Sequence, residues 1–299
     1  MLFNKKKIFN QNIKKQNVKQ LTAQENDDLK RMLLHIAKDI DIVCQKHNIK
    51  LFLVGGSLLG AVRNSGFIPW DDDIDFGLTR NDYTKFISIF DKELGDNYYL
   101  RCPNSKYPNG NRFMQIYRKG TILETIEGGT PLQPKCISVD IFPYDYVPNS
   151  KIIRIIKGIY CNALMLIASS VCNYYFEDKE YKSLISTTFE GRILNLLEKV
   201  MGIVFSWKKP EQWFNLVDKS VQGKTKTNFI TSAMGRRHYL GEIFPVEVFF
   251  PLRQIPFENL VLYSPQNADA YLRHNYGHSY MTPPPLDQRE SHFIKKLKI

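Results

Sequence analysis

The sequence predicts a mixed α/β fold, in which helices flank a β-sheet core and a helical insertion interrupts that core. Apolar residues recur at helical spacing in residues 25–47, and polar and apolar residues alternate in residues 73–78 as they do in a strand. Residues 150–234 carry mainly helical patterns. The 299 residues, 43% hydrophobic and 24% charged, have a globular composition, which excludes a disordered, collagen-like or coiled-coil chain.

The first half of the predicted core alternates helices and strands. The helix at 25–47 has acidic residues in its first turn, which favours the positive end of its dipole. Its apolar face comprises Leu29, Met32, Leu33, Ile36, Ile40 and Val43. The elements expected next are a short buried strand at 51–54 ended by Gly55-Gly56, a brief helix at 58–64, a strand at 73–78 and a helix at 81–94.

The rest of the chain predicts further strands and the insertion. Strands are expected at 98–102, 113–119, 137–142 and 253–263, and a last helix between 265 and 276. Polar residues interrupt the apolar stretch 158–176, which favours a buried or interfacial helix over a membrane span. The predicted divisions are a basic N-terminal tail (1–24), a core (25–149), the helical insertion (150–234) and a C-terminal strand and helix region that completes the core (235–299).

Charge and cysteine content bear on location. Residues 1–20 hold six Lys and no acidic residue, more than half of the net charge of +11. Such a tail is either solvated or bound to an anionic membrane surface. Five scattered Cys and the absence of a secretory signal predict a cytoplasmic protein. The basic net charge favours peripheral association with the inner face of the membrane. We find no nucleic-acid recognition module and predict no nucleic-acid partner.

A cluster of acidic residues predicts a metal site. In an extended segment Asp71, Asp73 and Asp75 point to one face and Asp72 to the other. Asp140, between two β-branched residues, supplies a carboxylate on a later strand. Neighbouring carboxylates repel one another unless a cation neutralises them, and Mg²⁺ prefers such oxygen ligands, with Mn²⁺ as the alternative. The competing interpretations are a solvated acidic turn and a calcium loop, although the calcium-loop pattern is absent.

Glycines before this cluster predict a phosphate contact. Gly55, Gly56 and Ser57 lie between a strand and a helix, where exposed backbone amides bind phosphate. The same Gly-Gly-Ser sequence also occurs in ordinary turns. Arg63 is the candidate phosphate partner, and Trp70 either stacks on a base or fills the core. Weaker phosphate candidates are Arg112, Arg118 and Lys119. A glycine turn followed by paired and single carboxylates resembles the nucleotidyltransferase superfold, with a longer loop of 16 residues between Gly56 and Asp73.

A longer stretch of sequence around these residues resembles one protein family. Residues 53–63 read LVGGSLLGAVR and residues 66–75 read GFIPWDDDID, which is similar to the signature of the LicD family, related to the animal fukutins. Residues 139–143 and 271–277, with Met281 and Pro283-Pro284, agree with it. The chain departs from the family at His278, where members often have Asp, which leaves His278 as either a new base or a surface histidine.

The resemblance implies an activity and a set of roles. It implies transfer of a phospho-alcohol, such as phosphocholine, from a CDP-linked donor to a sugar hydroxyl of a capsule, teichoic acid or lipopolysaccharide, with release of CMP. It further implies that Asp73, Asp75 and Asp140 hold Mg²⁺ against the donor diphosphate, that Asp140 or a nearby carboxylate accepts the proton of the hydroxyl, and that Gly56 and Ser57 line the phosphate path. The glycan acceptor could be lipid-linked.

Two other functions fit the residues. A nucleotidyltransferase that moves a nucleotide from a nucleoside triphosphate and releases pyrophosphate would use the same carboxylates. A non-enzymatic basic protein that binds a membrane or nucleic acid would not need the carboxylates at all. The product released from each donor distinguishes phospho-alcohol transfer from nucleotidyl transfer. An Asp73→Asn variant distinguishes both enzymes from the binding protein, because the binding protein would keep its function.

Overall fold

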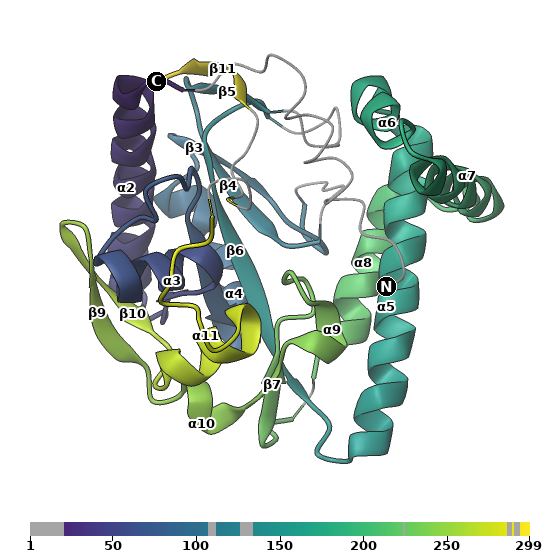
Figure 1. Cartoon of the computed structure of the whole chain (residues 1–299). Helices are drawn as coiled ribbons and strands as arrows, with labels where there is room; N and C mark the ends of the chain where they lie inside the picture. The colour runs from purple at the N-terminus through teal and green to yellow at the C-terminus, as the bar shows by residue number, and fades with distance from the viewer. Residues whose placement is uncertain (1–20, 107–111, 126–133, 224, 286–288, 290–293) are drawn as a thin grey trace.

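A seven-stranded run forms the centre of the molecule, in the order β3-β4-β6-β2-β1-β10-β9 (Figure 1). This computed structural model describes residues 21–106, 112–125, 134–223, 225–285, 289 and 294–299. β2 is parallel to β6 and β1 to β10, whereas the other pairs in this run are antiparallel, so the sheet is mixed as predicted. The strands are β1 (Phe52–Leu53), β2 (Asp75–Thr79), β3 (Tyr98–Arg101), β4 (Met114–Arg118), β6 (Ser138–Val147), β9 (Arg253–Phe257) and β10 (Leu260–Ser264).

Four short strands extend or flank this sheet. β7 (Phe229–Thr231) pairs with the end of β6 and with β8 (Ile243–Pro245). β5 (Ile122–Thr125) and β11 (Ile294–Lys298) form a separate antiparallel pair. These strands were not predicted, because most of them are only three or four residues long and lack a full period of alternation.

The core helices begin at recognisable caps. α2 (Ala23–Lys46) starts with a capping box, in which the side chains of Thr22 and Glu25 each accept a bond from the other's backbone N–H. α4 (Arg80–Glu93) starts where Thr79 Oγ1 accepts a bond from the backbone N–H of Asp82. The remaining core helices are α3 (Gly55–Asn64), the short α10 (Val246–Phe249) and α11 (Ala268–Tyr276).

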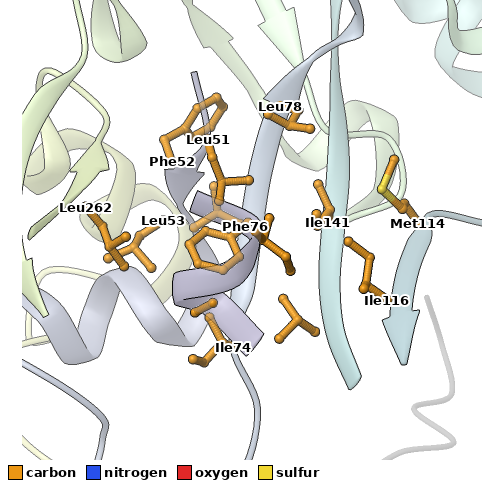
Figure 2. Close-up of a cluster of buried hydrophobic side chains, with 14 of the residues drawn as sticks. Leu51, Phe52, Leu53, Ile74, Phe76, Leu78, Met114, Ile116, Ile141 and Leu262 are labelled. Atoms are coloured by element: carbon orange, nitrogen blue, oxygen red, sulfur yellow. The ribbon is translucent and has the colours of Figure 1, made fainter. Parts of the chain in front are cut away.

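One face of the sheet is apolar and covered by α2 and α4. Phe76 in β2 and Ile141 in β6 are register partners, and both are fully buried. Figure 2 shows them with Ile74, Leu78 and Ile116 in one cluster. Because side chains alternate along a strand, the residues on either side of Phe76 and Ile141 must point to the opposite face. The apolar core therefore fixes which face of the sheet receives the intervening acidic residues.

A helical lobe stands beside the sheet (Figure 1). It consists of α5 (Lys151–Tyr175), α6 (Lys179–Ile185), α7 (Phe189–Val204) and α8 (Pro210–Val221), with the short α9 (His238–Gly241) next to it. Buried residues of α5 and α8, among them Cys161, Ala168, Trp213 and Val217, form a hydrophobic cluster separate from the main core. Among the described residues, α5 is the one helix long and apolar enough to cross a membrane by length and composition. The predicted membrane contact of residues 1–20 lies outside the described residues.

Candidate active site

Two carboxylates lie side by side on neighbouring parallel strands. Asp75 begins β2 and is the register partner of Asp140 in β6. Side chains of register partners point to the same face, and adjacent strands are about 4.8 Å apart, so the two carboxylates are neighbours. They share the face opposite Phe76 and Ile141, as the alternation of the core residues requires. The fold thus places Asp75 and Asp140, two of the acidic residues singled out from the sequence, side by side.

A neighbouring strand fixes the orientation of Asp140. Gln115 in β4 is the register partner of Asp140 on its other side, and its Nε2 donates to Asp140 Oδ1 at 3.0 Å. The hydroxyl of Tyr117 donates to Gln115 Oε1 at 2.6 Å, which sets the direction of the amide. Gln115 and Tyr117 are positioning residues that the sequence did not reveal, because an alternating strand contains such polar residues at many sites.

The first turn of α3 lies against these carboxylates. Ser57 Oγ accepts a bond from the backbone N–H of Asp75 at 2.8 Å. A Cβ built on Gly55 would stand 2.7 Å from Asp75 Oδ2, and one built on Gly56 would stand 3.0 Å from Asp71 Oδ2. The predicted glycine turn is therefore the start of the helix itself, since α3 begins at Gly55 rather than at Leu58. Its positive end stabilises negative charge at this place.

Burial and mutual repulsion disfavour ionisation in the cluster. Burial raises the pKa of Asp75 well above its usual range, and the nearby carboxylates of Asp73, Asp140, Asp71 and Glu242 raise it further. Burial also raises the pKa of Asp140 to about 7, opposed by the Gln115 hydrogen bond and assisted by Asp73. Acidic groups with pKa values near neutrality mark sites that exchange protons or receive a cation.

Glu242 is a further carboxylate of this region that sequence patterns did not indicate. It follows α9, is 4% exposed and accepts a bond from the backbone N–H of Arg237 at 2.9 Å. Burial raises its pKa to about 7. Tyr271 in α11 belongs to the stretch 271–277 that resembles the family. Its hydroxyl accepts a bond from the N–H of Gly55 at 3.1 Å. Segments distant in sequence thus complete the site.

Arg63 and Trp70 lie together at the end of α3. The guanidinium carbon of Arg63 is 5.6 Å from the centre of the Trp70 ring, and that of Arg289 is 4.1 Å from the same ring. Arg63 Nη1 also donates to the carbonyl of Tyr280 at 3.3 Å. Trp70 packs partly against the main core, which agrees with the predicted core role, and two guanidinium groups lie over its ring. Stacking on a base stays a prediction.

The weaker basic candidates are placed elsewhere. The guanidinium of Arg118 lies over the ring of Tyr98, and Lys119 Nζ donates to the carbonyl of Gly95 at 2.7 Å. Arg112 contacts the sulfur of Met165 in the helical lobe, where burial lowers its pKa. His278 is exposed beside Arg273, which fits a surface histidine. The contacts described for these four side chains are with other parts of the fold and not with Asp75 or Asp140.

The donor chemistry of the cluster fits a hard divalent cation. All its charged groups are carboxylates, and a cation would relieve the repulsion that raises the pKa of Asp75. In the part of the chain that the structure describes, no three His, Cys, Asp or Glu side chains stand in an arrangement that could hold a metal ion. An ion shared by Asp73, Asp75 and Asp140 would therefore require these side chains to turn toward one another.

Comparison with known proteins agrees with this site. The fold and the carboxylates on adjacent strands define a nucleotidyltransferase-type domain, and the family model described as LicD/FKTN/FKRP, nucleotidyltransferase domain, matches residues 48–196. The chain belongs to the LicD family. The matched segment contains β1, α3, β2 and β6, hence the acidic cluster up to Asp140, whereas Glu242 and Tyr271 lie beyond it.

Individual relatives differ in how much they share. The chain is 27% identical over 290 residues to the lipopolysaccharide cholinephosphotransferase LicD of Haemophilus influenzae, which covers 94% of this chain and 100% of that protein. An uncharacterised protein of Rickettsia typhi is 43% identical over 92 residues, 28% of each chain. One from Rickettsia prowazekii is 46% identical over 50 residues, 17% of this chain and 19% of the relative. The first similarity extends over the helical lobe and the C-terminal region.

Proposed function

We propose that this phosphotransferase moves a phospho-alcohol, phosphocholine in the first instance, from a CDP-linked donor to a sugar hydroxyl of a cell-surface glycan and releases CMP. The Haemophilus influenzae relative, a lipopolysaccharide cholinephosphotransferase matched over its full length, supports phosphocholine and a lipopolysaccharide acceptor. Capsule and teichoic acid are the alternative acceptors. The observation that carries the proposal is the pairing of Asp75 with Asp140 across β2 and β6.

In this proposal Asp73, Asp75 and Asp140 hold Mg²⁺, or Mn²⁺ in its place. The bound ion would neutralise charge on the donor diphosphate and on the departing CMP. Gln115 keeps Asp140 pointing into the site through its 3.0 Å hydrogen bond. Ser57 anchors the backbone of Asp75, which aligns the start of β2 with the first turn of α3. Gly56 and Ser57 then offer the phosphate path proposed from the sequence, and Arg63 lies one to two turns further along the same helix.

The bond changes are those of an in-line displacement. The sugar oxygen attacks the phosphorus that carries the alcohol, the bond from that phosphorus to the bridging oxygen breaks, and CMP departs with the bridging oxygen. The hydroxyl proton passes to a carboxylate of the cluster, for which Asp140 and Glu242 are the candidates. Burial raises the pKa of Glu242 to about 7, which suits a base that works near neutral pH.

The test is a release assay with matched variants. CMP is measured from CDP-choline, CDP-ribitol and CDP-glycerol, and pyrophosphate from CTP, with purified lipopolysaccharide, capsule polysaccharide or teichoic acid as acceptor. We expect CMP from CDP-choline with Mg²⁺, none with EDTA, and a loss of roughly 100-fold or more in Asp75→Asn and Asp140→Asn. Asp72→Asn is the control. The charge of Asp72 raises the pKa of Lys30, whereas other carboxylates raise the pKa of Asp75.

Three results would contradict the proposal or a part of it. Pyrophosphate released from CTP, without CMP release from any CDP-alcohol, would identify a nucleotidyltransferase instead. Full CMP release by Asp75→Asn would remove this carboxylate from the chemistry. CMP release that resists EDTA would leave the transfer in place and exclude the divalent ion.

A further inference from the structure

The first half of α5 exposes an apolar stripe to solvent. Ile152 is 71% exposed, Ile156 62% and Ile159 59%, and these residues are three or four positions apart, so they share one side of the helix. The opposite side of the helix is buried and includes Cys161 and Met165. A soluble helix normally turns its apolar side toward the core, so α5 has a second apolar side that nothing in the described structure covers.

The neighbouring α7 has the same peculiarity. It turns glycine toward α5, since a Cβ on Gly202 would lie 2.7 Å from the carbonyl oxygen of Ser170. Its apolar residues recur on the outer side, where Phe189 is 70% exposed and Leu196 62%. Further exposed apolar residues of this side are Leu197, Val200, Ile203 and Val204. Two adjacent helices of one lobe thus present isoleucine, leucine, valine and phenylalanine to the solvent.

The charges of α5 are basic, whereas α7 contains two acidic and two basic residues, Glu190, Glu198, Arg192 and Lys199. α5 contains Lys151, Arg154 and Lys157 and no acidic residue. After α7, the exposed ring of Trp207 lies under the ammonium of Lys208, 4.0 Å from the ring centre. Exposed aliphatic residues bordered by tryptophan and lysine are the composition of a helix that lies in the interface of a bilayer, with its cations toward anionic headgroups.

The packing of α5 favours lying on a membrane over crossing it. Lys157 Nζ donates to the carbonyls of Val221 and Gln222 at 2.9 and 3.1 Å, which fixes α5 to the end of α8. Its inner side belongs to the buried cluster with Trp213 and Val217. Spanning a bilayer would break these contacts, whereas lying flat keeps them. Figure 1 shows α5 at the margin of the molecule opposite α2, where a flat surface can reach it.

We propose that the helical lobe binds an anionic membrane surface through the exposed apolar stripes of α5 and α7. The stripes enter the headgroup layer, and Lys151 and Lys208 contact anionic lipid, since Lys157 is bonded to α8. This binding is independent of the chemistry at Asp75, so it would hold even if the proposed transfer reaction were wrong. A second copy of the chain, or residues 1–20 of the same chain, are the other partners that could cover the stripes, and the test separates them.

The experiment measures sedimentation of the full chain with vesicles. The vesicles contain phosphatidylcholine alone or phosphatidylcholine with phosphatidylglycerol, and circular dichroism confirms that each variant is folded. The test variant is I152S/I156S/I159S. The control variant I42S/Y99S/V261S removes residues of similar exposure, 53%, 48% and 60%, from α2, β3 and β10. The Asp75→Asn variant checks that binding does not depend on the acidic cluster.

The expected result is binding to the anionic vesicles, weakened by salt and reduced roughly 10-fold or more in the test variant. The control variant and Asp75→Asn should bind as the unmodified chain does, and Trp207 fluorescence should shift to the blue on binding. Equal sedimentation of the test variant would overturn the proposal. An absence of vesicle binding would also overturn it. A dimer in ultracentrifugation that dissociates in the test variant would then indicate a second copy of the chain on the stripes, and a monomer would indicate residues 1–20.

Discussion

Glu242 illustrates how burial, which no sequence pattern indicated, sets the pKa of a carboxylate. Its carboxylate accepts a hydrogen bond from the backbone N–H of Arg237 and lies close enough to Asp75 to raise the pKa of that group. Burial holds the pKa of Glu242 at about 7, above its usual value of 4.5. The folded protein therefore prefers the protonated form over a range in which the unfolded chain is already ionised.

This preference predicts a pH dependence of stability. A raised pKa costs nothing below about pH 4.5, and the cost grows as the pH rises toward and through 7, up to roughly 3 kcal/mol. In urea denaturation with EDTA, Glu242→Gln should match the unmodified protein at about pH 4 or below. Its advantage in free energy of unfolding should grow between about pH 4.5 and 7 and stay constant above that range. The control is Glu247→Gln, an exposed residue in α10. A difference between Glu242→Gln and the unmodified protein that does not change with pH would contradict the prediction.

Sequence alone located some of these residues for a physical reason. Asp75 and Asp140 lie between buried apolar neighbours in strands, and two-residue alternation then fixes the face to which they point. Glu242 stands after a four-residue helix, where no period exists to indicate its direction. Gln115 becomes recognisable only once the register of β4 against β6 is known, because register depends on long-range pairing.

At the scale of elements, the junction of β1 and α3 decides the shape of the site. Gly55 has a φ of +56°, and Tyr271 of α11 accepts its N–H, so strand, helix and a distant helix meet at one residue. The absent side chain leaves room for the carboxylate of Asp75. The sequence predicted a glycine turn here, but the helix begins three residues earlier than expected, because the chain turns at Gly55 itself.

A pair of glycine substitutions tests this junction. Gly55→Ala and Gly120→Ala both force alanine into a positive φ, which costs roughly 1–2 kcal/mol of stability. The new methyl group meets Asp75 Oδ2 at 2.7 Å in the first variant and nothing within 4 Å in the second. We therefore expect similar losses in urea denaturation, but CMP release lowered by at least roughly 10-fold only in Gly55→Ala. Equal activity of the two variants would show that the position of Asp75 is unimportant.

At the scale of the whole molecule, one buried arginine joins the sheet to the helical lobe. Arg80 at the start of α4 forms a two-pronged pair with Asp145 of β6, with bonds of 2.8 and 2.7 Å. A third bond of 2.8 Å reaches Asp218 of α8. Both carboxylates are almost fully buried, and they hold the pKa of Arg80 above its usual range despite the opposing effect of burial. The two hydrophobic clusters are otherwise separate, apart from the shared border at Phe142.

Removal of this arginine should uncouple the lobe from the sheet. Arg80→Met removes the cation from two buried carboxylates, of which Asp218 keeps its bonds from Asn104 and Gln222, and this costs about 3–5 kcal/mol in urea denaturation. Hydrogen exchange followed by mass spectrometry should show faster exchange in α5 and α8 than in α2, because the lobe loses its tie while the main core keeps its packing. The control Arg31→Met removes an exposed pair with Asp28 and should cost less than about 1 kcal/mol. If exchange rose equally in α2 and α8, the sheet and the lobe would form a single cooperative unit for which Arg80 is not the link.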